Sequence, residues 1–152
     1  MDATGRAAHT DPMPDIADDR HAIQDVIVTY AAAVDDRDLE TYRKCFMDDV
    51  ELGGFGPEPV RGLATWMEFV EKALAPYRAT QHMLGVPKIE IDGDTAHMRT
   101  DVQASHFPSD SADKTMILWA TYETDLLRTR EGWRIQRHTL VPRATKLDAG
   151  PR

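Results

Sequence analysis

The sequence predicts an α+β fold, in which three N-terminal helices pack on one face of a strongly curved, mostly antiparallel sheet. Two observations indicate this fold. Apolar residues recur at helical spacing up to Pro76 and alternate with a period of two after it. With 152 residues the chain is long enough for one core, so we expect a single domain over residues 18–143. Residues 1–17 are expected to form a flexible N-terminal lead-in, and residues 144–152 a C-terminal tail.

Three helices are expected before Pro76. Asp18 or Asp19 is predicted to cap the first, which ends near Asp35 and carries an apolar stripe: Ile23, Val26, Ile27, Tyr30 and Val34. Asp38 is predicted to cap a short second helix, which includes Cys45 and turns one side inward: Leu39, Tyr42 and Phe46. The third helix ends at Pro76 and carries its own stripe: Leu63, Trp66, Met67, Val70 and Leu74.

Strands are expected at Val50–Leu52 and then throughout the second half of the chain. The predicted ranges are Thr80–Ile91, interrupted by Pro87, then Thr95–Phe107, Thr115–Arg128 and Trp133–Val141. The Asp92-Gly93-Asp94 turn joins two of them as a hairpin. Apolar groups occur on both faces of the long Thr115–Arg128 segment, so we expect a homo-oligomer, a dimer or a trimer, that covers the sheet.

Composition excludes several classes of function. A net charge of −8 disfavours a nucleic-acid or anionic-membrane surface. No apolar run approaches the roughly 20 residues that cross a bilayer, and no hydrophobic signal core is visible at the N-terminus. The single cysteine, Cys45, fits a buried residue in a reducing cytoplasm. The six histidines show neither HxxxH nor HxH spacing, so neither a metal nor another cofactor is expected.

Two histidines lie on strand faces that are predicted to point inward. On Thr95–Phe107, His106 shares a face with Met98 and Val102, whereas His97 falls on the opposite face. His82 shares a face with apolar neighbours on a strand that alternates more weakly. Each inward histidine is compatible with two interpretations, a hydrogen-bonded core residue or a residue that lines a cavity.

Asp35 and Tyr30 lie near the end of the first predicted helix. The helix dipole and burial both disfavour the charged carboxylate, so the pKa of Asp35 is expected to rise. Such a placement suggests a partner, for example a histidine. The alternative is a solvated acidic turn formed by Asp35, Asp36 and Asp38. Tyr30 belongs to the apolar stripe and is either a core residue or a hydrogen-bond donor to a ligand.

Several segments together resemble the SnoaL-like and scytalone-dehydratase-like branch of the nuclear-transport-factor-2-like superfamily, whose fold is a cone with a central cavity. The resemblance covers about residues 18–143. Its segments are Ile23-Gln24-Asp25 through Tyr30, Ala33–Leu39, Phe46–Val50, Thr80–Gly85 and Leu127–Ile135. The pair of Asp35 and His82 is its most specific part.

The resemblance implies roles for these residues. His82 would be the base, Asp35 its orienting partner, Tyr30 a hydrogen-bond donor or acid, and His106 an aid to the leaving hydroxyl. A cationic residue of the hexachlorocyclohexane dehydrochlorinases falls near His138. Residues expected to contact the substrate are Tyr122, His138, Trp119 and Phe55.

The chain also departs from its relatives. Two substrate-activating tyrosines of scytalone dehydratase correspond to Val34 and Gly54, so scytalone itself is disfavoured as substrate. The aspartate of the ketosteroid isomerases corresponds to Leu52 or Gly53, which disfavours that isomerase chemistry. The function expected is a lyase that dehydrates a hydrophobic small molecule without a cofactor. Two alternatives remain open, a polyketide cyclase or isomerase with the same pair, and a domain that only binds a ligand or dimerises.

Overall fold

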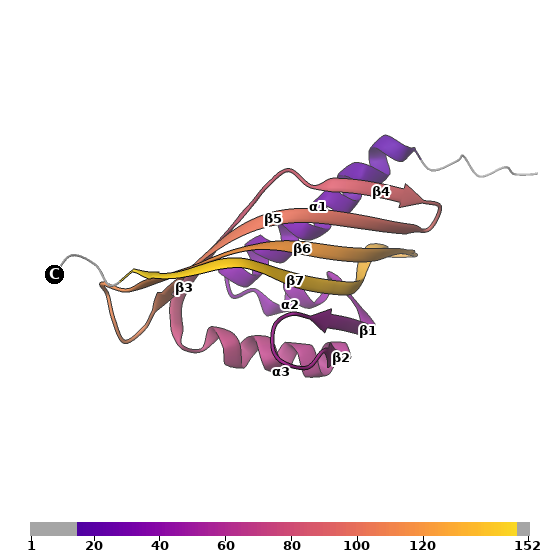
Figure 1. Cartoon of the computed structure of the whole chain (residues 1–152). Coiled ribbons are helices and arrows are strands. Elements are labelled where there is room, and N and C mark those ends of the chain that lie inside the picture. Colours follow the sequence, from indigo (N-terminus) through magenta and orange to yellow (C-terminus); the bar gives the residue numbers. More distant parts are fainter. Residues whose placement is uncertain (1–14, 149–152) are drawn as a thin grey trace, which may run out of the picture.

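The computed structural model describes residues 15–148, and Figure 1 shows their arrangement. Most of the predicted N-terminal lead-in, residues 1–14, and the end of the predicted tail, residues 149–152, lie outside the described residues. The elements up to residue 74 are α1 (Ile16–Asp35), α2 (Leu39–Arg43), β1 (Phe46–Gly53), β2 (Val60–Arg61) and α3 (Leu63–Leu74). The remaining five are β3 (Tyr77–Leu84), β4 (Lys88–Asp92), β5 (Thr95–Pro108), β6 (Thr115–Thr129) and β7 (Gly132–Asp148).

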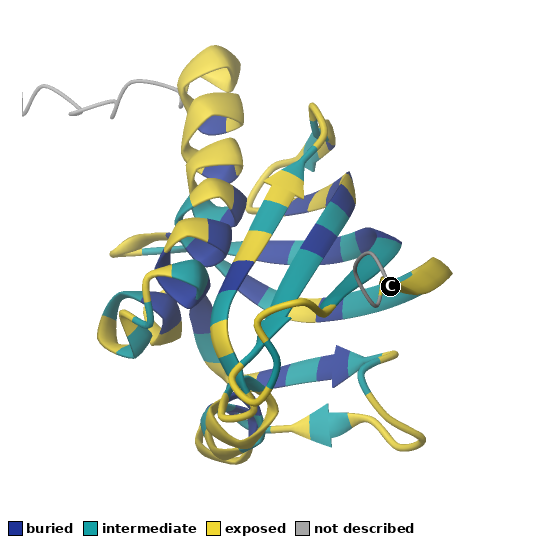
Figure 2. Ribbon diagram, turned by 90° about the vertical axis from the view of Figure 1, so that its left-hand side faces the viewer, coloured by how far each residue is buried: buried dark blue, intermediate teal, exposed yellow. Residues whose placement is uncertain are grey.

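The strands form one open, curved sheet, as predicted, with the order β2-β1-β7-β6-β5-β3 and with β4 also paired to β5. All pairings are antiparallel except that of β1 with β7, which is parallel. The long helix α1 crosses one face of the sheet behind β4–β7 (Figure 1). Its sheet-facing side is buried and its other side exposed (Figure 2). The sheet and the helices therefore form two layers around one core, which confirms the α+β prediction.

Helix α1 begins earlier than predicted. Asp15, not Asp18 or Asp19, is the N-cap, and its side chain accepts a hydrogen bond from the Ala17 amide. Asp19 is instead buried and receives two hydrogen bonds from the Arg128 guanidinium, at 2.6 and 2.7 Å. The Trp133 indole N–H also donates to this carboxylate. The acidic residue thus has a tertiary role that helix-capping rules do not predict.

Other boundaries differ for local reasons. Asp38 caps α2 as predicted, but the helix ends at Arg43, so Phe46 belongs to β1 and Cys45 lies buried between the two elements. Pro87 divides the predicted strand into β3 and β4, since proline cannot donate to a ladder. Strand β7 runs beyond the predicted end at Val141, because its ladder with β6 continues to Asp148.

The core lies between α1, α3 and the concave face of the sheet. Strand β5 alternates as predicted, with inward residues that are buried and outward neighbours that are exposed or half-buried. Met98 has no exposed surface, and Trp66 of α3 is only 2% exposed. Each such side chain contributes roughly 1.5–3 kcal/mol when it is removed from water. Across residues 15–148 no helix is long and apolar enough to cross a bilayer.

Loss of the Asp19 charge is expected to destabilise the fold. In Asp19→Asn the bidentate ion pair with Arg128 is lost, which should lower the free energy of unfolding by about 1–3 kcal/mol in urea denaturation at pH 7. Asp18→Asn is the matched control, because Asp18 is exposed in the same helical turn and should change stability by only a few tenths of a kcal/mol.

The same pair makes a prediction about pH. Hydrogen bonds from Arg128 lower the pKa of Asp19 below its usual 3.8, so the carboxylate stabilises the fold above that value. The advantage over Asp19→Asn should shrink as the pH falls through the lowered pKa. An advantage that is independent of pH down to full protonation would contradict this assignment.

Candidate functional site

A cavity of about 140 Å³ lies between α1, α3 and the concave face of the sheet. Aromatic and aliphatic side chains dominate its wall, and among residues 15–148 no Asp, Glu, Lys or Arg lines it. The polar groups on the wall are three tyrosines, one tryptophan and two histidines: Tyr30, Tyr42, Tyr122, Trp66, His82 and His106. A cavity of this composition suits an uncharged ligand with few polar groups.

Asp35 and His82 meet at the edge of this cavity. Asp35 is the last residue of α1, and His82 lies in β3, so the contact depends on the docking of the helix against that strand. Asp35 Oδ1 lies 2.7 Å from His82 Nδ1, and Asp35 Oδ2 accepts a hydrogen bond of 2.7 Å from the His82 amide. The side chains are only 18% and 11% exposed, respectively. The carboxylate therefore holds both the ring and the backbone of this histidine.

The pKa of Asp35 moves in the direction opposite to the prediction. Burial raises this pKa. Hydrogen bonds from the ring and amide of His82 and from the Thr80 hydroxyl lower it by more than burial raises it, so the pKa of Asp35 lies below its usual 3.8. The position against the helix dipole is outweighed because three donors converge on one carboxylate. Asp35 is thus a carboxylate at neutral pH.

This network assigns the proton on the imidazole. A carboxylate oxygen only accepts hydrogen bonds, so Nδ1 of His82 must carry the proton. In the neutral ring Nε2 then has a free lone pair. Within residues 15–148 this nitrogen has no hydrogen-bond partner, and the side chain lines the cavity. The pair can therefore accept a proton from a bound molecule.

His106 lines the same cavity from the neighbouring strand β5, with 6.1 Å between its ring centroid and that of His82. Burial lowers the pKa of His106, so its ring is neutral at pH 7. Its Nδ1 is buried without a hydrogen-bond partner among the described residues. Such an atom costs free energy unless a ligand or water binds it. His106 points inward to the cavity, as the strand pattern predicted.

Tyr30 belongs to a cluster of phenols. Its hydroxyl interacts with those of Tyr42 and Tyr122, and the Trp66 indole donates to Tyr42 at 3.2 Å. Burial raises the pKa of Tyr30 well above its usual value of 10, so the phenol keeps its proton. Sequence reasoning missed Tyr42 and Trp66 as wall residues, although both lie on the apolar faces that it identified. A tyrosine or tryptophan on a buried helix face needs a hydrogen-bond partner for its hydroxyl or indole N–H, and this need could have indicated a polar site inside the core.

The predicted substrate contacts divide into three groups. Phe55 and Tyr122 line the cavity. His138 is fully buried behind it, packed on Tyr122 with 4.5 Å between ring centroids, and burial lowers its pKa to about 3. The His138 ring is therefore neutral at pH 7, and it cannot supply the positive charge that the resemblance to the dehydrochlorinases placed near this position. Its Nδ1 lies 2.9 Å from the Thr124 hydroxyl.

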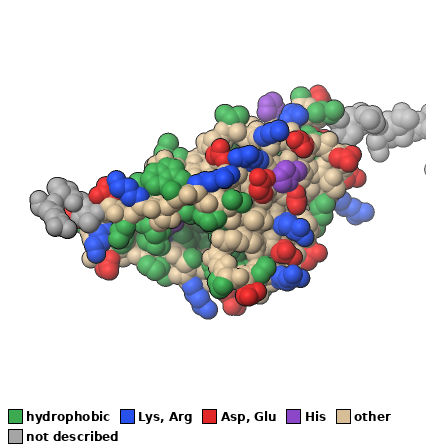
Figure 3. Space-filling model, in the orientation of Figure 1, with side chains coloured by type: hydrophobic (Ala, Val, Ile, Leu, Met, Phe, Trp, Pro, Cys, Tyr) green, Lys and Arg blue, Asp and Glu red, His purple; other side chains and the backbone are tan. Residues whose placement is uncertain are grey.

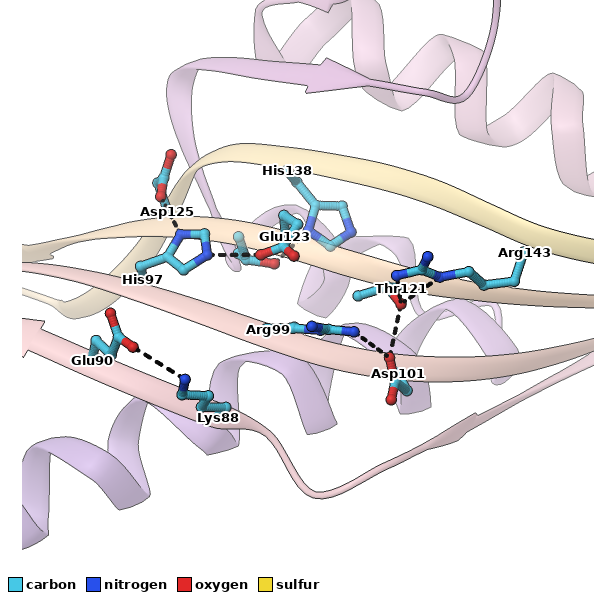
Figure 4. Close-up of polar contacts among 11 residues, drawn as sticks. Lys88, Glu90, His97, Arg99, Asp101, Thr121, Glu123, Asp125, His138 and Arg143 are labelled. Carbon is cyan, nitrogen blue, oxygen red and sulfur yellow. Dashed lines mark hydrogen bonds and ion pairs between the residues drawn. The ribbon is translucent and has the colours of Figure 1, made fainter.

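Trp119 lies apart from the cavity. It belongs to the outward face of β6, where its indole donates to Gln103 at 3.2 Å beside an open hollow of about 600 Å³. This outer face carries basic and acidic side chains side by side (Figure 3), with His97 between Glu123 and Asp125 (Figure 4). Alternation along the strand explains the placement, because odd-numbered residues here point away from α1.

The backbone at Gly54 gives a physical reason for a glycine at this position. Its φ is 80°, and a Cβ atom there would lie 1.9 Å from the Leu140 carbonyl oxygen. No tyrosine side chain fits at this position without movement of β7.

Two residues next to the pair escaped the sequence analysis. Thr80 donates to Asp35 at 3.0 Å, and Arg37 donates to Thr80 at 2.8 Å. Thr80 lies two residues before His82 and so on the same strand face, which was a usable signal. Within residues 15–148 no group of three or more His, Cys, Asp or Glu side chains could hold a metal ion.

The chain belongs to the SnoaL-like domain family, whose model matches residues 15–139. An uncharacterised protein of Mycobacterium tuberculosis is 29% identical over 124 residues, which cover 78% of this chain and 82% of that protein. The family assignment agrees with the resemblance inferred from the sequence.

Solved structures show the same fold. A candidate aromatic ring hydroxylase from Novosphingobium aromaticivorans superposes with a TM-score of 0.80 at 28% identity, over 88% of this chain and 96% of the other. The LinA-type3 hexachlorocyclohexane dehydrochlorinase of Novosphingobium barchaimii gives 0.79 at 18% identity, over 90% and 94%. A candidate scytalone dehydratase from Novosphingobium aromaticivorans gives 0.77 at 21% identity, over 87% and 88%.

Asp35→Asn should destabilise the protein, because an amide has a single acceptor oxygen. One of the two N–H donors of His82 would then face the amide NH₂ group without an acceptor. We expect the free energy of unfolding to fall by about 1–2 kcal/mol in urea denaturation at pH 7. Asp36→Asn is the matched control: Asp36 is exposed, and its replacement should change stability by less than about 0.5 kcal/mol. Equal effects of the two substitutions would contradict the description of the site.

Proposed function

We propose that this protein is a lyase that removes a proton and a β-leaving group from an uncharged, hydrophobic small molecule, without a cofactor. The observation that carries the proposal is the 2.7 Å contact between Asp35 and His82 at the wall of an apolar cavity. A histidine with a protonated Nδ1, a carboxylate behind it and a free Nε2 is arranged as a general base.

The reaction would begin with abstraction of an acidic C–H proton by His82 Nε2. The electron pair of that bond becomes the new C=C bond, and the C–O bond to the β-hydroxyl breaks with its electrons on oxygen. Asp35 stabilises the imidazolium that forms. The released hydroxide then takes the proton from His82, so the products are an alkene and water and the histidine is regenerated.

Two other wall residues would assist. His106 is neutral, so a ring N–H can donate a hydrogen bond to the leaving oxygen without the ring being charged beforehand. Tyr30 keeps its phenolic proton and can donate to a carbonyl oxygen, where negative charge develops when the C–H proton leaves.

The cavity also restricts the substrate. About 140 Å³ is close to the roughly 150 Å³ of an engineered protein cavity that binds benzene. This size and the apolar wall favour a compact molecule of about one ring over a polycyclic one. The names of the similar structures include dehydratase, dehydrochlorinase and hydroxylase, so likeness alone does not choose the reaction. A candidate base at His82 with a candidate hydrogen-bond donor at His106 in the same cavity supports the proposed elimination.

His82→Gln and Asp35→Asn test the proposal. Both variants would be assayed with wild type against a panel of small cyclic β-hydroxy and β-chloro ketones, followed by ultraviolet absorbance of the conjugated product. Loss of the base should lower kcat by about 10²–10⁴. His97→Gln, on the outer sheet face, is the control and should keep wild-type turnover.

Circular dichroism would establish that each variant is folded. Full turnover by folded His82→Gln would sink the proposal. Rearranged or cyclised products with the same loss in both variants would instead support a cyclase or isomerase. Ligand binding without turnover in the wild type would support a binding domain.

The leaving-group role of His106 has its own test. A β-hydroxy ketone expels hydroxide, which needs hydrogen bonding, whereas the matched β-chloro ketone expels chloride, which needs far less. His106→Gln should therefore lower kcat for the hydroxy substrate by about 10²-fold and for the chloro substrate by much less, after correction for spontaneous elimination. Equal losses on both substrates would assign His106 to binding and not to the leaving group.

A further inference from the structure

Arg37 has an unusual backbone conformation at the end of α1. Its φ is 59°, in the left-handed region where glycine is strongly favoured. The chain turns there because the Arg37 amide donates to the Val34 carbonyl and the Asp38 amide donates to that of Ala33. This pair of bonds is the common glycine-type end of a helix. A glycine would satisfy the backbone, so the presence of an arginine needs an explanation in its side chain.

The guanidinium of Arg37 points back to the candidate site. One nitrogen, Nη1, donates to the Val34 carbonyl at 2.7 Å and to the Thr80 hydroxyl at 2.8 Å. The other, Nη2, lies 3.5 Å from the Tyr77 carbonyl. Arg37 therefore connects the end of α1, which carries Asp35, to the strand that carries His82.

The direction of these hydrogen bonds is fixed by chemistry. A guanidinium only donates, so the Thr80 oxygen accepts from Arg37. The Asp35 carboxylate only accepts, so the single hydroxyl proton of Thr80 must point to Asp35 Oδ1. Guanidinium, hydroxyl, carboxylate and imidazole thus form one chain in which each hydrogen bond has a defined direction, and such chains strengthen each member.

We propose that Arg37 is a positioning residue for the Asp35–His82 pair: through Thr80, its guanidinium holds the carboxylate in the orientation that accepts from His82 Nδ1–H. An effect of Arg37 on catalysis rests on the lyase function proposed above. The orientation itself is measurable in the free protein.

Two pairs of variants separate the side chain from the backbone. Arg37→Gly removes the guanidinium but keeps the residue type that the left-handed conformation favours, and Arg130→Gly, in the exposed β6–β7 turn, is its control. Thr80→Val removes the hydroxyl at nearly constant volume, and Thr80→Ser restores it. If Arg37→Gly fails to fold, the threonine pair still tests the chain.

The first readout is nuclear magnetic resonance of the free protein, with no substrate. We expect the downfield proton signal of His82 Nδ1–H to weaken or broaden in Arg37→Gly and Thr80→Val, and to persist in Thr80→Ser and Arg130→Gly. The pKa of the Asp35 carboxyl, followed by its carbon-13 shift, should rise in the first two variants and not in the others. A general loss of stability would not reproduce this pattern.

The second readout is turnover of any substrate that the wild type accepts. Arg37→Gly and Thr80→Val should lower kcat by about tenfold, as removal of groups that orient a functional histidine does elsewhere, with KM nearly unchanged. Identical nuclear magnetic resonance signals in all variants would overturn the inference, whatever the turnover. If the signals change in Arg37→Gly and Thr80→Val but the wild type turns over none of the panel, the result would support the inference and count against the lyase proposal alone.

Discussion

The position of α1 on the concave face of the sheet depends on a hydrogen-bonded carboxylate near each of its ends. Near the first end, the buried Asp19 accepts from Arg128 and Trp133. At the last residue, Asp35 accepts from His82 and Thr80. Between them an apolar stripe packs on the core, but a stripe alone would permit sliding or rotation of the helix. Two directional contacts on one rigid helix, at Asp19 and at Asp35, fix its register.

That fixed register brings together residues from elements far apart in the chain. The end of α1 contributes Tyr30 and Asp35, β3 contributes His82, and β5 contributes His106. Because β3 pairs with β5, His82 lies opposite Ala104 and Thr80 opposite His106, so both histidines share the concave face. The same contact that stabilises the fold at Asp35 also orients the His82 ring and places a proton on its Nδ1. Stability and the proposed chemistry therefore share one hydrogen-bond network, and Arg37 belongs to both.

The outer face of the sheet has a different character. It carries ion pairs in which His97 bridges Glu123 and Asp125 at 2.7 Å each, and hydrogen bonds from Arg143 to Thr121 (Figure 4). Hydrogen bonds that the His97 ring donates to Asp125 and Glu123, opposed by partial burial, raise the pKa of His97 above its usual 6.5. The stabilisation from this protonated ring is therefore complete below that value and is lost as the pH rises through the raised pKa. Strands β5 and β6 thus carry the apolar cavity on their concave face and charged side chains on their outer face.

The sequence by itself determined the order of the helices and strands and the inward face of β5, since periodicity is local. The family resemblance implied the pairing of Asp35 with His82, and the docking of α1 against β3 decided it. Sequence reasoning predicted the wrong direction for the pKa of Asp35, because donors more than 40 residues away, His82 and Thr80, decide that direction. It also missed the buried role of Asp19, because the partners Arg128 and Trp133 are more than 100 residues away. The buried neutral state of His138 and the outward place of Trp119 likewise required the tertiary structure. Dihedral preferences and residue spacing are encoded along the chain, whereas solvation and hydrogen-bond partners exist only after strands and helices have packed.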